Sequence, residues 1–102
     1  MMNVGEYVDL ILKKKKITRT EFTKRINRVE EKLGDTRTTV TNVTNYLNGY
    51  HAIRPKAVAK WEVALGLEEG TLLKMVSNPL SSDGEKEFKE LIKKLREIRR
   101  ML

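Results

Sequence analysis

The fold of this chain is decided by the stretch Thr39-Val-Thr-Asn-Val-Thr-Asn-Tyr-Leu-Asn-Gly49. Its pattern predicts a short helix with Thr39 as N-cap, one apolar edge and a glycine stop. Helix propensity does not favour so many Thr and Asn residues, because both types compete for backbone hydrogen bonds. Short hydroxyl and amide side chains instead suit a helix in the major groove of DNA, where donors and acceptors must approach the base edges closely. We therefore expect this segment to be a recognition helix.

Composition and charge narrow the class of protein. With 102 residues, of which 39% are hydrophobic and 34% charged, the chain is expected to form one small globular domain. No apolar run approaches the roughly 20 residues of a membrane span, and the N-terminus lacks the basic start of a signal peptide, so we expect a cytoplasmic protein. Zero Cys and a single His exclude thiolate metal sites and an imidazole cluster, and we expect no cofactor. The net charge of +7 predicts attraction to a polyanion.

Two helices are predicted before the Thr/Asn segment. Apolar residues at helical spacing predict the first helix over residues 4–15. The second begins with the capping box Thr18-x-x-Glu21 and continues to Gly34, which makes it long.

Two further helices are predicted after the Thr/Asn segment. Pro55 opens a fourth helix at its first position, and Gly66 closes it. Trp61 lies at core spacing in that helix, and we interpret it as a packing residue. Residues 67–76 predict a short fifth helix. Five helices joined by short loops predict an all-α bundle that contains a helix-turn-helix.

The last part of the chain differs in character. Residues 77–84 have the composition of a linker, and residues 85–102 predict an amphipathic helix. Its apolar residues follow a heptad stripe. The stripe consists of Phe88, Leu91, Ile92, Leu95, Ile98 and Leu102. This helix either packs on its own domain or pairs with a second copy. We favour a dimer interface, because a linker frees the helix from the body and two-fold symmetry suits a DNA reader.

The order of these segments resembles the lambda-repressor/Cro-type helix-turn-helix proteins of the XRE family. The resemblance covers about residues 4–76. It rests on the segments Ile17-Thr-Arg-Thr-Glu-Phe-Thr23, Val43-Thr-Asn-Tyr-Leu-Asn-Gly49, Pro55 through Ala64-Leu-Gly-Leu67, and Thr71-Leu-Leu73. The chain departs from the family by extra residues at about 27–36, which predict an extended second helix. The resemblance implies a five-helix lambda-repressor-like DNA-binding domain over residues 1–76.

Helix geometry predicts which residues would read the bases. If Val43 and Leu47 anchor the third helix to the core, its exposed N-terminal surface carries positions that match those with which the family reads bases. These positions are Val40, Thr41, Asn42, Thr44 and Asn45. Asn can bind adenine with two hydrogen bonds, Thr can donate or accept, and Val can contact a thymine methyl. The alternative is that they are simply solvated polar residues of a helix.

Basic and aromatic residues around this helix are expected to contact phosphate. Arg19 occupies the place that contacts phosphate in the family, and we also expect it to brace the recognition helix. The other expected phosphate contacts are Arg37, Tyr50, His51, Arg54 and Lys56. Such contacts fix the register of a protein on DNA without reading its sequence.

Three functions from different classes follow from these observations. The first is a transcriptional repressor of phage or mobile-element origin that binds operator DNA as a homodimer. The second is a protein-interaction module, such as an antirepressor or an antitoxin, that uses an XRE-like fold; a protein antirepressor is also a possible partner of the repressor. The third is an enzyme acting on nucleic acid, which we do not expect, because no acidic metal cluster or general-base pair is visible.

Overall fold

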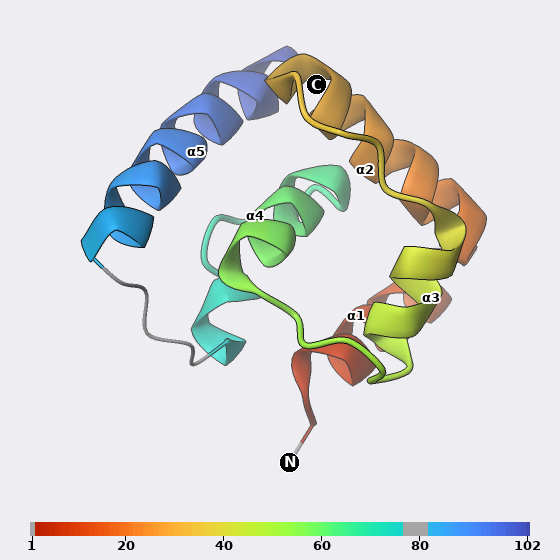
Figure 1. Cartoon of the computed structure of the whole chain (residues 1–102). Coiled ribbons are helices and arrows are strands. Elements are labelled where there is room, and N and C mark those ends of the chain that lie inside the picture. Colours follow the sequence, from red (N-terminus) through yellow and green to blue (C-terminus); the bar gives the residue numbers. More distant parts are fainter. Residues whose placement is uncertain (1, 77–81) are drawn as a thin grey trace.

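The computed structural model describes residues 2–76 and 82–102, and within these ranges it is helical, with no strand (Figure 1). The elements follow in the order α1 (Val4–Lys15), α2 (Arg19–Leu33), α3 (Val40–Leu47), α4 (Pro55–Ala64), the 3-10 turn η1 (Leu73–Met75) and α5 (Ser82–Met101). The all-α class is therefore confirmed. None of the described helices is both long and apolar enough to span a membrane.

Local capping signals explain where the first helices begin. The side chains of Asn3, Thr18 and Thr39 accept hydrogen bonds from backbone N–H groups in the first turns of α1, α2 and α3. Each cap satisfies a donor that has no partner inside the helix. Pro55 occupies the first turn of α4. At the end of α2, Gly34 adopts a left-handed φ of 75°, which favours glycine. The predicted caps and the long second helix are confirmed.

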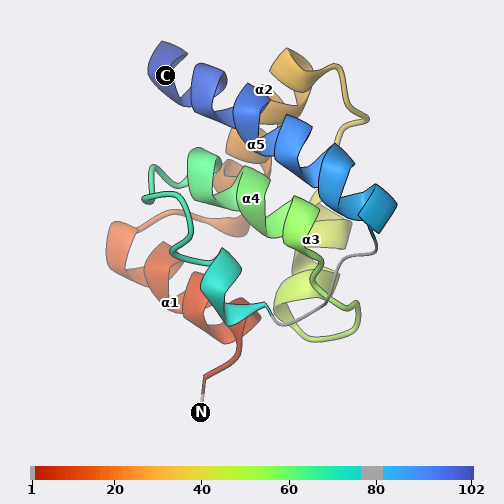
Figure 2. The ribbon, with the colours of Figure 1, turned by 90° about the vertical axis from the view of Figure 1, so that its left-hand side faces the viewer.

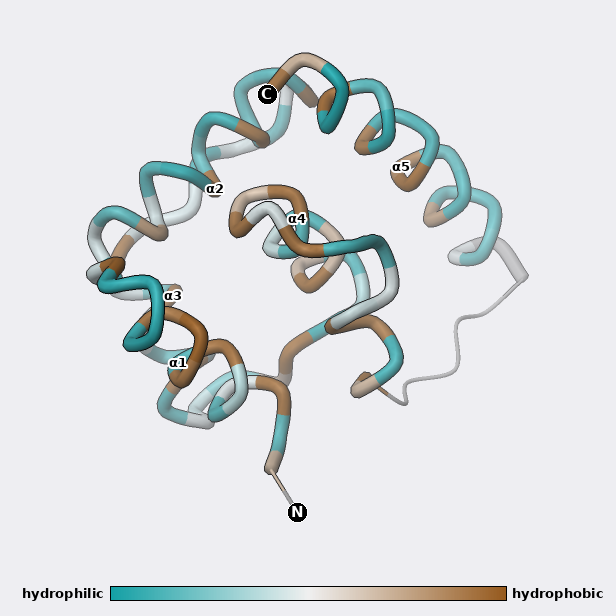
Figure 3. Tube along the Cα trace, turned by 180° about the vertical axis from the view of Figure 1, so that it is seen from behind, coloured by the Kyte–Doolittle hydropathy of each residue, from teal (hydrophilic) through white to brown (hydrophobic). Residues whose placement is uncertain are grey.

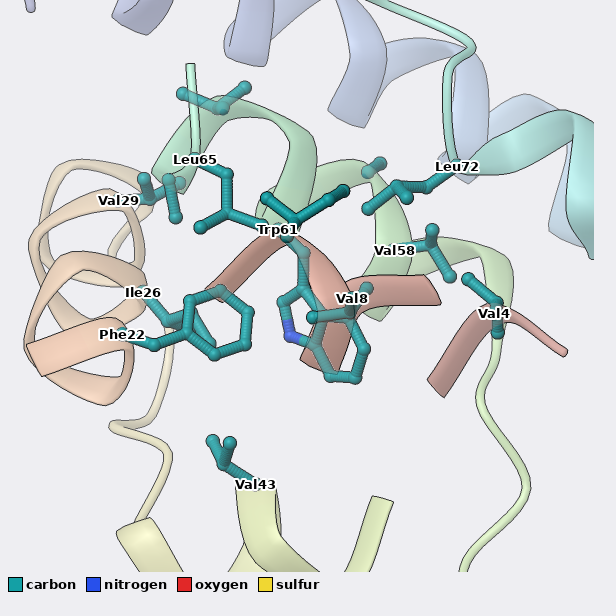
Figure 4. Packing of buried hydrophobic residues seen from close by; sticks show 14 of the residues in the cluster. Val4, Val8, Phe22, Ile26, Val29, Val43, Val58, Trp61, Leu65 and Leu72 are labelled. Atoms are coloured by element: carbon teal, nitrogen blue, oxygen red, sulfur yellow. The ribbon is translucent and has the colours of Figure 1, made fainter. Parts of the chain in front are cut away.

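The hydrophobic core surrounds α4, which lies at the centre of the other helices in Figures 1 and 2. Trp61 of α4 is 2% exposed. Its ring meets the ring of Phe22 edge-on at a centroid distance of 5.6 Å and that of Tyr46 at 5.9 Å. Figure 4 shows Val8, Phe22 and Val58 around it. The interpretation of Trp61 as a packing residue is confirmed.

The fifth helix predicted over residues 67–76 is wrong, because only the short turn η1 forms there. The Glu62 carboxylate, which is buried, accepts backbone N–H groups from Gly70 at 3.0 Å, Leu72 at 2.6 Å and Leu73 at 3.0 Å. Gly70 has a left-handed φ of 95°. The backbone therefore turns around the carboxylate, and regular structure is confined to one turn. Leu72 is nevertheless fully buried in the core.

Helix α5 packs on its own chain, against α4 and α2. Leu95 and Ile98 are each 3% exposed and belong to the common core. Half-buried against the same core are Phe88, Leu91 and Ile92. Figure 3 shows the hydrophobic residues of α5 on the side that faces α4. Of the residues expected at a dimer interface, only Leu102 is largely exposed. The structure thus agrees with the first of the two alternatives, in which this helix packs on its own domain.

The bounds of α5 also correct the expected linker. The helix begins at Ser82, so residues 82–84 are helical, and it does not start at residue 85. Residues 77–81 of the expected linker lie outside the described residues.

Polar contacts attach α5 along its length. Lys56 at the start of α4 pairs with Glu87 at 3.0 Å. Arg96 donates two hydrogen bonds to the Glu69 carboxylate, at 2.8 and 2.9 Å. This hydrogen-bonded guanidinium holds the pKa of Glu69 below its ordinary value of 4.5. These contacts tie α5 to the start of α4 and to the turn after it.

Candidate nucleic-acid interface

Helix α3 is anchored by two residues and presents a polar surface. Val43 is fully buried and Leu47 is 8% exposed, so the predicted anchors are confirmed. Of the five expected base-reading residues, three are exposed and two are half-buried. Exposed are Val40, Thr41 and Asn42, and half-buried are Thr44 and Asn45. The anchored face and the polar surface therefore belong to the same two turns of helix.

A buried carboxylate fixes the loop that leads into α3. Glu30 of α2 is 3% exposed, and its carboxylate accepts the Thr38 N–H at 2.9 Å and the Thr38 hydroxyl at 2.7 Å. The Asn27 side-chain oxygen accepts the same N–H at 3.0 Å. Lys60 of α4 lies 3.5 Å from Glu30 and 2.9 Å from Asp35. This network holds the residue that precedes the Thr39 cap, and so it sets where α3 begins.

Glu30 was not singled out from the sequence, and so this role was missed. The signal was present, because Glu30 lies four residues after the buried Ile26 and therefore on the same face of α2. A charged residue on an apolar helix face needs a buried partner.

The other end of α3 is held by α2 and α1. Arg19 donates a hydrogen bond to the side-chain oxygen of Asn48 at 3.2 Å and lies 3.5 Å from Asp9. This is the brace to the third helix that the sequence predicts. Gly5 of α1 packs closely here, since a Cβ atom at that position would lie 3.4 Å from the carbonyl oxygens of Tyr46 and Leu47. A Cβ atom would therefore just touch the backbone of α3, and glycine allows the two helices to come this close.

The loop after α3 folds back onto it. The ring of His51 meets the ring of Tyr46 edge-on at 5.6 Å, and its Nε2 lies 3.5 Å from the side-chain nitrogen of Asn45. Among the described residues, no carboxylate forms a hydrogen bond or an ion pair with His51. His51 is therefore placed to orient the Asn45 amide, and it lacks the acid partner that a general base commonly uses.

The six residues expected to contact phosphate differ in their exposure and in their contacts with other side chains. Arg37 and Arg54 are exposed and make no ion pair with any described residue, and Tyr50 is 77% exposed. The remaining three are engaged in the contacts given above, namely Arg19, His51 and Lys56. Arg37 precedes α3 and Arg54 follows it, so free guanidinium groups flank the helix along the chain.

A small cavity of about 220 Å³ lies beside α3 and the start of α4. Tyr46 and Thr38 line one part of it, and Arg54, Lys56 and Lys60 contribute positive charge. Glu30 contributes the negative charge that pairs with Lys60. The described residues hold no group of three or more His, Cys, Asp or Glu side chains that would suit a metal ion. The side chains around α3 thus offer hydrogen bonding and positive charge.

Comparisons with protein-family models, curated proteins and solved structures found no match to this chain.

Proposed function

We propose that this protein is a sequence-specific DNA-binding transcriptional regulator that acts as a repressor, of the kind found in phages and mobile elements. The single observation that carries this proposal is the surface of α3. Its exposed residues are short amides, hydroxyls and one valine, while Val43 and Leu47 fix the helix to the core. The order of motifs along the chain supports the same proposal, because it resembles the order in lambda-repressor-like domains.

Recognition would take place with α3 in the major groove. Asn42 and Thr41 lie exposed in its first turn, where base edges are reached first. Asn45 lies one turn later, and its amide can offer adenine a donor and an acceptor once it leaves His51. Val40, which is 39% exposed, suits the methyl group of thymine.

Phosphate contacts would fix the position of α3 on the duplex. Arg37 and Arg54 are free to bind phosphate oxygens on either side of the helix. Lys56 must first leave Glu87, so its contribution would be smaller. The net charge of +7 favours the approach to DNA in general.

Two copies would occupy a palindromic operator, one on each half-site. Because the apolar stripe of α5 covers its own core, we place any contact between the copies on the body of the protein and not on this stripe. Pairing would then be cooperative on DNA.

Selection of bound sites from random duplex DNA tests the proposal. We expect enrichment of one short motif, repeated with two-fold symmetry at about one helical turn, roughly 10–10.5 base pairs. Binding without any enriched motif would contradict sequence-specific recognition and would favour the protein-interaction module instead.

A further inference from the structure

Three arginines surround a second cavity, which lies between α2, the end of α4 and α5 and has a volume of about 410 Å³. Arg25 and Arg28 come from α2, and Arg99 comes from α5, whose end lies beside α2 in Figure 1. The cavity shares no lining residue with α3. Its volume falls within the range of about 300–1,000 Å³ that small-molecule sites occupy.

The positive charges of this cavity are poorly balanced. No Asp or Glu side chain lines it, and its lining residues also include Leu102. Arg28 makes no ion pair with any described residue, and Arg25 has only a 3.5 Å contact with the half-exposed Glu21. The Nε atom of Arg99 is buried and has no hydrogen-bond partner among the described residues. A buried donor without a partner is costly, and like charges repel, so an anion in the cavity would relieve both.

Only one of the three arginines has a hydrogen bond to the backbone near the end of α4. Helix C-termini attract cations, and Arg99 donates a hydrogen bond to the carbonyl of Leu67 just beyond α4. Neither Arg25 nor Arg28 makes a hydrogen bond to a carbonyl of α4. The end of α4 therefore acts on these two guanidinium groups only through space, and their hydrogen-bond donors stay available to a ligand.

We propose that this cavity binds a small amphiphilic anion. Arg28 and Arg25, together with Arg99, would hold its carboxylate or phosphate head, since a guanidinium fork matches the geometry of such oxyanions. The nonpolar body would lie on the wall formed by Val63, Ala64 and Leu65. This proposal concerns a different face from α3 and does not depend on DNA binding.

Titration with octanoate and with octyl phosphate, followed by NMR of the full chain at constant ionic strength, tests the proposal. We expect saturable shifts of the Leu65 and Gly66 amides with at least one of the two head groups, and the tighter head group identifies the class of ligand. Arg28→Gln should weaken that binding about tenfold or more, because it removes a charge-assisted contact. Arg100→Gln removes the same charge from an exposed residue that does not line the cavity, and it should leave binding unchanged.

Several results would overturn the proposal. Shifts that do not saturate, or that sodium chloride reproduces, would show charge screening only. If Arg28→Gln and a second variant, Arg25→Gln, both bind the octyl probe with wild-type affinity, the arginine cluster is not the binding group. Duplex DNA is also added in a competition titration. If it displaces the octyl probe, and if Arg28→Gln weakens DNA binding as much as it weakens binding of the probe, the cavity belongs to a nucleic-acid surface instead. Thermal unfolding of each variant without ligand checks that the fold is kept.

Discussion

Buried glutamates shape the chain on both sides of α4. Glu30 binds the backbone and hydroxyl of Thr38, and Glu62 binds three backbone N–H groups in the turn that ends at η1. A buried carboxylate is tolerated only when hydrogen bonds replace its water. Each glutamate therefore fixes a loop that apolar packing alone would leave free to move.

Replacing Glu30 by Ala should lower the free energy of unfolding by about 1–3 kcal/mol, because the half-buried Thr38 loses its hydrogen bonds to the carboxylate. Urea unfolding followed by circular dichroism measures the change. Glu31→Ala is the matched control, since Glu31 is the next residue of α2 and is exposed, and it should cost less than about 0.5 kcal/mol. Equal effects of both substitutions would show that Glu30 does not hold the loop before α3.

Arg54 tests the proposed phosphate contacts more cleanly than Arg19 does. Arg19 also holds Asn48 and Asp9, so its loss would disturb α3, whereas Arg54 makes no ion pair within the described residues. Arg54→Ala should weaken binding to selected and random duplex alike. It should also lower the slope of log affinity against log salt by about one unit. An unchanged slope in fluorescence anisotropy would remove Arg54 from the DNA surface.

At the level of elements, α5 completes the core of its own chain. Leu95→Ala should lower the free energy of unfolding by about 2–5 kcal/mol, because it leaves a cavity against α4. Leu10→Ala, at a site that is 39% exposed, is the control and should have a much smaller effect. If sedimentation shows that Leu95→Ala instead dissociates a dimer without loss of stability, then α5 pairs between chains.

The Glu69–Arg96 pair predicts how the attachment of α5 depends on pH. Hydrogen bonding to Arg96 lowers the pKa of Glu69 in the folded chain below its ordinary value of 4.5. The pair therefore stabilises the fold above that ordinary value and stops doing so as the pH falls through the lowered one. We expect wild type to be more stable than Glu69→Gln at neutral pH, with the difference shrinking below pH 4.5. A difference that stays constant from pH 7 to about pH 3 would contradict this coupling.

Over the whole molecule, the features that sequence predicts best are those set by near neighbours in the chain. Thr18 and Thr39 cap helices whose first turns they precede, and Pro55 is suited to the first turn of a helix. The anchors Val43 and Leu47 follow from the 3.6-residue period. The surface of α3 could therefore be placed from sequence alone.

Apart from the start of α5, which is three residues earlier than expected, the errors concern contacts between segments that are apart in the sequence. Nothing local shows that Glu62 will take the backbone donors of Leu72 and prevent a fifth helix. The heptad stripe of α5 likewise fits either a partner helix or its own core, and only the packing of Leu95 against the rest of the chain distinguishes them. The pair between Lys56 and Glu87 joins residues that no local pattern relates.

The central claim is that α3 reads base sequence, and Asn45→Ala tests it most directly. Affinities of wild type and variant are measured on the duplex enriched by selection and on random duplex. We expect a loss of about 1–3 kcal/mol on the selected duplex and almost none on random DNA, in contrast to Arg54→Ala, which should weaken both. An equal loss on both duplexes, or no loss on either, would contradict base reading by Asn45.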